Sequence, residues 1–326
     1  MRTTHVLSTL LITALSSYAM AKGTTQTPDA ALALTTINGV PLKVNVGDDM
    51  SFQVFNTTID GGATGQIYPS TQTTLADMGW MVRVGSTLYA PSFSAHGSTA
   101  TSGLGTLVPY GAPTASSVSG SGTTAAPFTV TTTGTLGATL SSSQRVTYVN
   151  GENFFRKAFT LTNSAAAPVS VRVFLGSDIF LASSDSGKPF REPQSGAPGG
   201  QNCAGVTPTY TILHISQGTP AAASFSATGF SSIWSQIGAG ALNNTVNTAA
   251  CIDNGAALGW DVAIPAGGST TFSAATSFGA IPGVIVGPPP VVAPIVPVPT
   301  LGNISLMLLV TGLLGFGVVL VGRRQA

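Results

Sequence analysis

Four aspartates are the side chains with which this chain could do chemistry. Asp178 and Asp185 stand at the two ends of a short segment, Asp253 precedes Asn-Gly, and Asp261 follows a tryptophan. Two carboxylates held about 5 to 10 Å apart can serve as acid and base on a glycosidic bond, and acidic loops can hold calcium. Asp-Ser-Gly and Asp-Asn-Gly are also turn sequences, in which the aspartate bonds its own backbone. We favour turns or strand ends, and we expect no catalytic residue and no metal, because no EF-hand or nonapeptide calcium repeat is present.

The histidines and the common catalytic motifs give no further candidate. His5 lies near the N-terminus, His96 lies in a Ser/Gly-rich stretch, and His214 lies within an alternating apolar segment, where we expect it to pack as a strand residue. The sequence has no HExxH motif and no Cys-His spacing of the kind that binds zinc. The sequence has no Gly-x-Ser-x-Gly, no Walker loop and no strand-linked GxGxxG. We therefore predict that the chain is not an enzyme and uses no cofactor.

Charged residues are scarce in this sequence. Its 326 residues include 12 Lys plus Arg and 11 Asp plus Glu, so that charged residues make up 7%, against roughly 25% in an ordinary soluble domain. Coiled coils, charge-rich disordered tails and nucleic-acid binders all need more charge than this. The apolar fraction of 43% is enough for the core of one large or two smaller domains. We expect a folded chain that binds no nucleic acid.

The elements that must position the aspartates are predicted to be β-strands. About eleven short segments alternate apolar and polar residues between Gly, Pro, Asn or Ser. These segments are 42–46, 51–57, 80–89, 128–133, 145–149, 154–162, 169–175, 210–215, 224–228, 258–264 and 270–276. No window of a dozen residues between them keeps a helical period with caps. The fold class we predict is all-β: an antiparallel β-sandwich, one large or two packed, over residues 22–281.

Two turns and three tryptophans refine this prediction. Asn150-Gly151 accepts positive φ and is expected to close a hairpin. Residues 265–268 are expected to close a second hairpin between segments 258–264 and 270–276. The tryptophans are expected to fill the core, although one that is exposed beside a tyrosine would be able to stack on a sugar ring. The residues concerned are Trp80, Trp234, Trp260, Tyr89 and Tyr110.

The N-terminal residues 1–21 are predicted to be a secretory signal peptide. Arg2 precedes an uncharged run at 6–15, and Ala19-Met20-Ala21 is the small-x-small pattern that signal peptidase accepts. The apolar run is too short to span a bilayer. We expect cleavage before Lys22 and export of the body of the protein.

The C-terminal part is predicted to be a linker followed by a transmembrane helix. Residues 282–299 include seven prolines and form a Pro-rich, extended spacer. Residues 301–322 carry no charge and are followed by Arg323 and Arg324, and at about 1.5 Å per residue they span a hydrocarbon core. By the positive-inside rule the two arginines keep the C-terminus in the cytoplasm, so that the body lies outside.

The order of motif, helix and basic end in residues 298–326 resembles the IPTL-CTERM sorting signal of Gram-negative bacteria, a relative of PEP-CTERM. The motif here is Val298-Pro299-Thr300-Leu301, with Val298 where the family usually has Ile. Gly302 and Ile304 also differ from the residues that the family commonly has at these two positions. The resemblance implies recognition at the inner membrane by an exosortase-type membrane protease, which cuts near the motif and passes the protein to the cell surface.

Several short strings resemble a group of exported bacterial proteins that carry this same C-terminal signal. The resemblance covers most of 92–279 and implies a β-rich ectodomain without an established activity. One difference is Ile179, where that group often has Cys. The strings are 119–123 with 127–130, 148–151, 161–163, 178–187 and 253–260.

An exported chain meets an oxidising compartment, in which cysteines form disulfides. Cys203 and Cys251 are the two cysteines, and we expect them to pair. Taken together, the sequence predicts an exported protein of the cell surface or extracellular matrix with a structural or interaction role and a possible surface glycan or protein partner. The alternative is a carbohydrate-active or glycan-binding β-sandwich protein, which would use two of the four aspartates.

Overall fold

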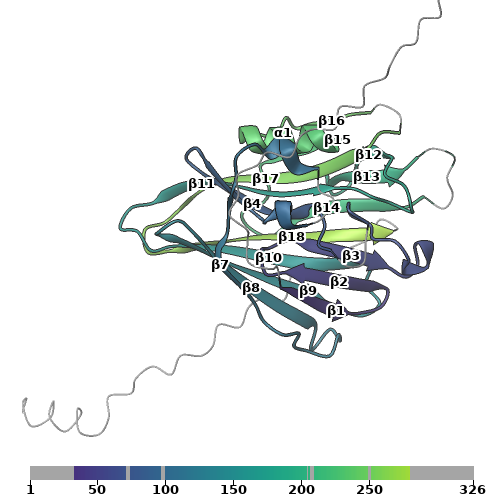
Figure 1. Ribbon diagram of the computed structural model, residues 1–326, viewed down its shortest axis with the longest axis horizontal. Coiled ribbons are helices and arrows are strands. Elements are labelled where there is room, and N and C mark those ends of the chain that lie inside the picture. Colours follow the sequence, from purple (N-terminus) through teal and green to yellow (C-terminus); the bar gives the residue numbers. More distant parts are fainter. Residues whose placement is uncertain are drawn as a thin grey trace, which may run out of the picture. The chain divides into compact units, whose positions relative to one another are not determined.

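The computed structural model describes residues 33–70, 74–96, 100–203, 205, 209–248 and 251–279 (Figure 1). The predicted signal peptide with Ala19 and Ala21, the linker at 282–299, the motif at 298–301, the helix at 301–322 and the arginines at 323 and 324 lie outside these residues. Among the described residues, no helix has the length and hydropathy needed to span a membrane.

Most of the described chain forms two large sheets. The eight-stranded sheet has the order β12 (Gly187–Arg191), β13 (Pro198–Asn202), β14 (Thr211–Gln217), β18 (Ser269–Gly279), β10 (Phe154–Asn163), β9 (Leu140–Tyr148), β8 (Phe128–Leu136) and β7 (Gly111–Ala115). The seven-stranded sheet has the order β16 (Thr245–Val246), β15 (Ser224–Gly229), β17 (Asn254–Ile264), β11 (Val169–Asp178), β4 (Met78–Val84), β5 (Thr87–Ala90) and β6 (Val108–Pro109). Neighbouring strands are antiparallel except in the pairs β15–β16 and β5–β6. The predicted all-β, antiparallel architecture is confirmed.

A third sheet of three strands lies against the eight-stranded sheet. It consists of β1 (Leu34–Asn38), β2 (Leu42–Gly47) and β3 (Phe52–Asn56), drawn purple in Figure 1. The Phe52 ring lies 5.5 Å from that of Phe155 in β10, and the Leu42 amide donates to the Tyr148 hydroxyl of β9 (3.1 Å). A single bridge between Ser51 and Gly79 links this small sheet to the seven-stranded one.

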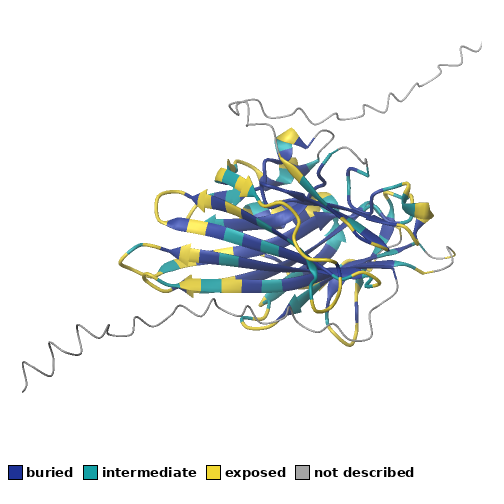
Figure 2. Ribbon diagram, turned by 90° about the horizontal axis from the view of Figure 1, so that it is seen from below, coloured by how far each residue is buried: buried dark blue, intermediate teal, exposed yellow. Residues whose placement is uncertain are grey.

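Aromatic side chains from both large sheets fill the space between them. Trp80 of β4 stacks on Phe159 of β10 with ring centroids 5.0 Å apart, and Trp260 of β17 packs 6.0 Å from Phe272 of β18. The predicted core tryptophans Trp80, Trp234 and Trp260 are all buried, so none of them is available to stack on a sugar. Figure 2 shows the period-two alternation of buried and exposed residues along strands such as β8, as expected for a sheet with one covered face.

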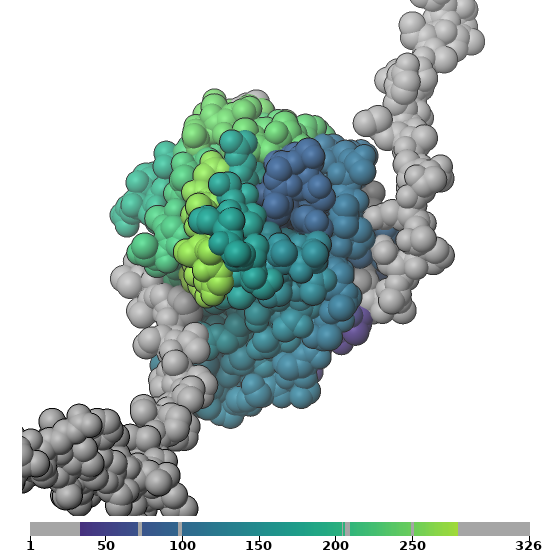
Figure 3. All heavy atoms as spheres, turned by 90° about the vertical axis from the view of Figure 1, so that its left-hand side faces the viewer, coloured from purple at the N-terminus to yellow at the C-terminus, as the bar shows by residue number. Residues whose placement is uncertain are grey.

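The predicted hairpin at 265–268 is wrong in one respect. β17 pairs with β11 and β15, whereas β18 pairs with β10 and β14, so the turn crosses from one sheet to the other. It lies beside the β10–β11 connection, since the Gly267 amide donates to the Ala165 carbonyl (3.2 Å). Figure 3 shows this end of the sandwich, with the connection from β17 to β18 in yellow-green. Both strands have an apolar face, and these faces meet across the core, which alternation alone does not distinguish from a hairpin.

A helix that the sequence analysis did not predict covers the outer face of the seven-stranded sheet. α1 (Phe230–Ala239) buries Ile233, Trp234 and Ile237 against β4, β11 and β17. A Cβ at Gly176 of β11 would lie 2.7 Å from Ile237, so this glycine lets the helix approach the sheet. The helix has no side-chain N-cap. Tertiary burial rather than local helix propensity therefore stabilises it.

Candidate functional site

Three of the four candidate aspartates meet beside the ends of two central strands of the seven-stranded sheet. Asp178 is the last residue of β11, Asp253 immediately precedes β17, and Asp185 lies in the loop before β12. Because β11 and β17 are antiparallel with Asp178 opposite Gly255, the ends that carry two of these carboxylates are neighbours. One carboxylate oxygen from each residue lies within 4.8 Å of the others. We call these three residues the acidic cluster.

The fourth candidate, Asp261, lies elsewhere. Its Oδ1 is 2.9 Å from Nε of Arg172, and both side chains are more than half exposed. The pair joins two central strands of the seven-stranded sheet, β17 and β11, on the face that bears α1. Asp261 is therefore separate from the acidic cluster and serves below as a control position.

Backbone hydrogen bonds and the disulfide fix the loops that carry the acidic cluster. Gly187 and Ile252 exchange two backbone hydrogen bonds of 2.8 Å, so the chain next to Asp185 is held against the chain next to Asp253. Cys203 and Cys251 form the predicted disulfide, with Cα atoms 5.4 Å apart. The Cys203 sulfur also lies 3.3 Å from the Ser186 carbonyl oxygen. The three carboxylates are thus brought together by covalent and hydrogen-bonded constraints.

The carboxyl groups of the cluster differ in exposure, and one oxygen of each of Asp178 and Asp253 has no donor among the described residues. Asp178 is 2% exposed, Asp253 is half-buried and Asp185 is exposed. Oδ1 of Asp178 and Oδ1 of Asp253 are both buried and have no hydrogen-bond partner within the described part of the chain. The turn interpretation predicted that the aspartates bond their own backbone. In the Asp-Ser-Gly turn it is the Ser184 hydroxyl that bonds Ser186 instead, accepting from its amide (3.1 Å) and donating to its carbonyl (2.9 Å).

Burial raises the pKa of every member of the cluster, and repulsion between carboxylates raises the pKa of Asp178 and Asp253 further. Burial raises the pKa of Asp178 well above its usual 3.8, and the charges of Asp253, Asp77 and Asp185 raise it further. Burial followed by the charge of Asp185 raises the pKa of Asp253 to about 7, and burial raises that of Asp185. All the charged neighbours that shift these groups are acidic. The cluster therefore needs protons or a cation near neutral pH.

Tyr68 borders the acidic cluster and was not singled out from the sequence. Its amide donates to the Asp178 carbonyl (3.3 Å), and its carbonyl accepts from the Asp77 amide (2.6 Å). Burial raises the pKa of the Tyr68 phenol, and the charges of Asp185 and Asp178 raise it further. The side chain is half-buried. A partly accessible aromatic ring therefore lies close to the carboxylates, brought there by a pairing between Ile67 and Ile179 that no sequence motif signals.

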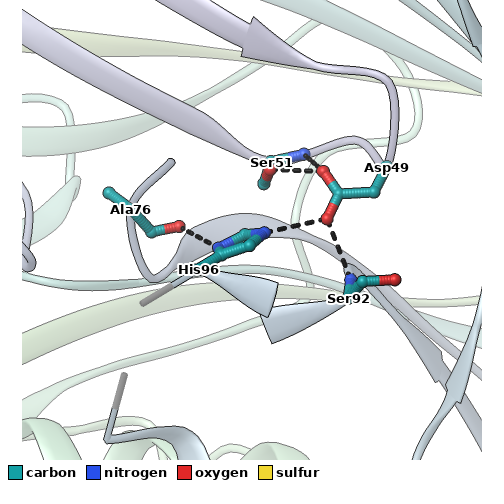
Figure 4. Close-up of polar contacts among 5 residues, drawn as sticks. All are labelled: Asp49, Ser51, Ala76, Ser92 and His96. Atoms are coloured by element: carbon teal, nitrogen blue, oxygen red, sulfur yellow. Dashed lines mark hydrogen bonds and ion pairs between the residues drawn. The ribbon is translucent and has the colours of Figure 1, made fainter. Parts of the chain in front are cut away.

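A second polar cluster, around Asp49 and His96, is closed by its own hydrogen bonds (Figure 4). Nε2 of His96 lies 2.9 Å from Oδ2 of Asp49, which also accepts from the Ser92 amide (2.9 Å). Oδ1 of Asp49 accepts from the amide and the hydroxyl of Ser51, and Nδ1 of His96 lies 3.1 Å from the Ala76 carbonyl oxygen. Asp49 and His96 are each 1% exposed. The cluster joins the turn between β2 and β3 to the segment after β5, and it has a structural role.

His214 packs as a strand residue, as predicted. Its Nε2 lies 2.7 Å from the Ser177 hydroxyl and its Nδ1 lies 3.0 Å from the Thr276 hydroxyl, which also accepts from the Lys157 amine. A hydroxyl beside an imidazole is the arrangement of a nucleophile and its base. These four residues are 0% exposed. The network therefore lies in the core, where a substrate has no access.

Acid is expected to destabilise the protein through His214. Burial, and then the charge of Lys157, lowers the pKa of His214 to about 3 from 6.5. Between these values the unfolded chain binds a proton that the folded chain does not, so the free energy of unfolding falls by about 1.4 kcal/mol per pH unit as the pH drops below 6.5. Urea unfolding from pH 7 to pH 4 should show a shallower pH dependence in His214→Gln. Equal slopes in both proteins would contradict this assignment.

Comparisons with known proteins give distant structural similarity. No family model matches the chain, and no curated protein matches it. A heparan sulfate lyase HepC mutant from Pedobacter heparinus is similar at 8% identity and a TM-score of 0.41, over 77% of this chain and 36% of the lyase. A galactose mutarotase-like protein from Lactobacillus casei is similar at 10% identity and a TM-score of 0.34, over 76% of this chain and 100% of that protein. This chain spans about a third of the length of the lyase.

These comparisons correct one prediction. Two further similar structures are named for a kojibiose phosphorylase and an aldose 1-epimerase, each with a TM-score of 0.35. The expectation that this chain is not an enzyme is contradicted, since the four similar structures named here carry the names of carbohydrate-processing enzymes or of a protein like one. Identities of 8 to 12% and TM-scores of at most 0.41 assign no residue and no substrate. The function is therefore argued below from the geometry of the acidic cluster.

Proposed function

We propose that this protein is an exported β-sandwich protein that binds carbohydrate at the acidic cluster, beside Tyr68. The observation that carries the proposal is the pair of buried carboxylate oxygens, Oδ1 of Asp178 and Oδ1 of Asp253, for which the described residues offer no donor. A buried acceptor without a donor costs about 1 to 3 kcal/mol. A ligand that brings donors to these two oxygens would remove that cost.

Sugars have the chemistry that fits this site. Adjacent hydroxyl groups donate hydrogen bonds to carboxylate oxygens, and the apolar face of a sugar ring packs on an aromatic side chain. The exposed carboxyl of Asp185 and the half-buried ring of Tyr68 leave the site open to solvent. The site therefore suits a glycan that inserts one edge of a ring or a chain end.

The pKa of Asp253 favours acid–base catalysis on a glycosidic bond as a second candidate function. A carboxyl with a pKa of about 7 is protonated often enough near neutrality to act as a general acid. The exposed Asp185 would be its partner carboxylate. The two carboxyl groups are close neighbours, since one oxygen of each lies within 4.8 Å of the other, and paired carboxyl groups are what glycosidases use.

A glycan array with the full-length protein tests the proposed function. Wild type should bind a defined set of glycans saturably, and Asp253→Asn should bind them at least about tenfold more weakly, because an amide presents one acceptor oxygen instead of two. Asp261→Asn makes the same chemical change at an exposed position and should bind as wild type does. No saturable binding by wild type, or equal loss in both variants, would contradict the proposal. Release of reducing sugar by wild type from a bound glycan would favour the second candidate.

Export and sorting complete the proposal. Supporting it are the residues 1–21 with the Ala19-Met20-Ala21 site for signal peptidase, and the motif 298–301 with Arg323 and Arg324 for an exosortase-type membrane protease. The disulfide between Cys203 and Cys251 agrees with an oxidising compartment. The intact mass of the protein from its host is the test. A chain from Lys22 to about Thr300 on the cell surface supports processing, and a chain that ends at Ala326 in the inner membrane contradicts it.

A further inference from the structure

We propose that the acidic cluster of Asp178, Asp185 and Asp253 binds a divalent cation of the calcium class, and that glycan hydroxyl groups complete the ligand shell of that ion. The cation site stands on the geometry of the cluster. Its role in glycan binding rests on the function proposed above. The two parts are tested separately.

The spacing of the carboxylates suits calcium. One oxygen from each of the three residues lies within 4.8 Å of the others. Oxygens this close to one another can serve as ligands of one ion. Calcium takes six to eight oxygen ligands in a flexible geometry, whereas Mg²⁺ usually binds through one or two carboxylates and keeps several waters, so a site of three carboxylates favours calcium. The ligands are all oxygens, which calcium prefers and zinc does not.

The unpaired oxygens point independently to a missing cationic ligand. Asp178 is 2% exposed, and its Oδ1 accepts no hydrogen bond from any described residue. Within the part of the chain that the structure describes, the ion pairs are His96–Asp49, Arg156–Glu152 and Arg172–Asp261, and none includes a member of the cluster. A divalent cation would supply the positive charge that the protein itself does not.

The exposure of the cluster leaves room for a second ligand of the ion. Calcium takes six to eight oxygen ligands, and three carboxylates supply three to six of them. Asp185 is exposed and Asp253 is half-buried, so the open positions of the ion face solvent. Two adjacent hydroxyl groups of a sugar can replace water there. The adjacent ring of Tyr68 would then contact the same sugar.

Calorimetric titration of the metal-free, full-length protein with CaCl₂ tests the cation site. Wild type should bind one Ca²⁺ per chain with a dissociation constant between about 10⁻⁵ and 10⁻³ M, the range of moderate and extracellular sites. Asp178→Asn should weaken this binding at least tenfold, and Asp261→Asn should leave it unchanged. Calcium should raise the Tm of wild type and of Asp261→Asn but not that of Asp178→Asn. No binding by wild type, or the same affinity in all three proteins, would overturn the proposal.

A replacement variant, a titration with Mg²⁺ and a glycan-binding measurement with and without calcium keep the proposal testable. If Asp178→Asn does not fold, Asp185→Asn replaces it, because Asp185 is exposed and its side chain is not part of the core. Binding of Mg²⁺ as tight as that of Ca²⁺ would overturn the assignment to calcium. Calcium binding without any glycan binding would leave the cation site standing and refute the proposed function. Glycan binding that is equal in calcium and in EDTA would refute the role of the ion and leave the proposed function standing.

Discussion

Replacing Asp49 with alanine should lower the free energy of unfolding by about 3 to 5 kcal/mol, the cost of breaking a buried ion pair from one side. Asp49 accepts hydrogen bonds from Ser51, Ser92 and His96, and both it and His96 are almost fully buried. The alanine variant leaves these donors without an acceptor and His96 without a counter-charge. Urea unfolding at pH 6 measures the difference. A loss below about 1 kcal/mol would show that the pair contributes little.

The pH dependence of this effect separates charge from hydrogen bonding. Burial lowers the pKa of His96, but the hydrogen bond and charge of Asp49 outweigh it and raise the pKa above 6.5. Burial raises the pKa of Asp49, but the hydrogen bond and charge of His96 outweigh it and lower the pKa below 3.8. The contribution of His96 is therefore complete below pH 6.5 and is lost as the pH rises through its higher folded-state pKa. The contribution of Asp49 is complete above pH 3.8 and is lost as the pH falls through its lower folded-state pKa.

It follows that the stability lost in Asp49→Ala should be greatest between about pH 4 and 6.5 and should become smaller as the pH rises through the raised pKa of His96. Asp49→Asn is the matched control. It keeps one acceptor oxygen and removes only the charge, so it should lose less stability at pH 6 than the alanine variant does. If the loss in Asp49→Ala is the same at pH 6 and at every higher pH, the ionic part of the interaction is absent.

Strand faces could be predicted from the sequence, but sheet membership could not. Alternation correctly places Trp260 and Ile264 on the buried face of β17, because period two is a local property. The partner of a strand depends on distant segments. The turn at 265–268 therefore looked like a hairpin, although it connects two sheets. α1 was missed for a related reason: the sheet that buries Trp234 and Ile237 is not visible from the helix sequence alone.

The candidate site was predictable in its residue types but not in its grouping. The sequence nominated Asp178, Asp185 and Asp253 together with Asp261 and interpreted them as turns or strand ends. This fits Asp178 at the end of β11 but did not group the three residues. The sequence does not show that the segments at 169–175 and 258–264 pair. Knowledge of this pairing would have placed the ends of β11 and β17 side by side and separated Asp261 from the other three aspartates. Asp49 carried no signal, because its partner His96 is 47 positions away and a Gly-Asp-Asp turn is ordinary in composition. Long-range pairing is thus the information that the sequence analysis lacked.

Removal of the disulfide should both destabilise the protein and loosen the acidic cluster. Cys203 and Cys251 are 48 positions apart, and closing a loop of that length stabilises the folded state by about 4 kcal/mol in the chain-entropy model. The double variant Cys203→Ser/Cys251→Ser should therefore lose about 4 kcal/mol in urea unfolding, and a loss below about 1 kcal/mol would contradict the entropic account. The double variant avoids the free thiol that a single substitution would leave.

The position of the disulfide predicts a second effect, on ligand binding. Cys251 stands two residues before Asp253, and the Cys203 sulfur contacts the carbonyl of Ser186, next to Asp185. The bond therefore limits the movement of two of the three carboxylates, and a cluster of like charges held this way is preorganised for a cation. At a temperature where both proteins are folded, the double variant should bind calcium several-fold more weakly than wild type. Unchanged affinity would show that the backbone bonds between Gly187 and Ile252 suffice to hold the cluster together.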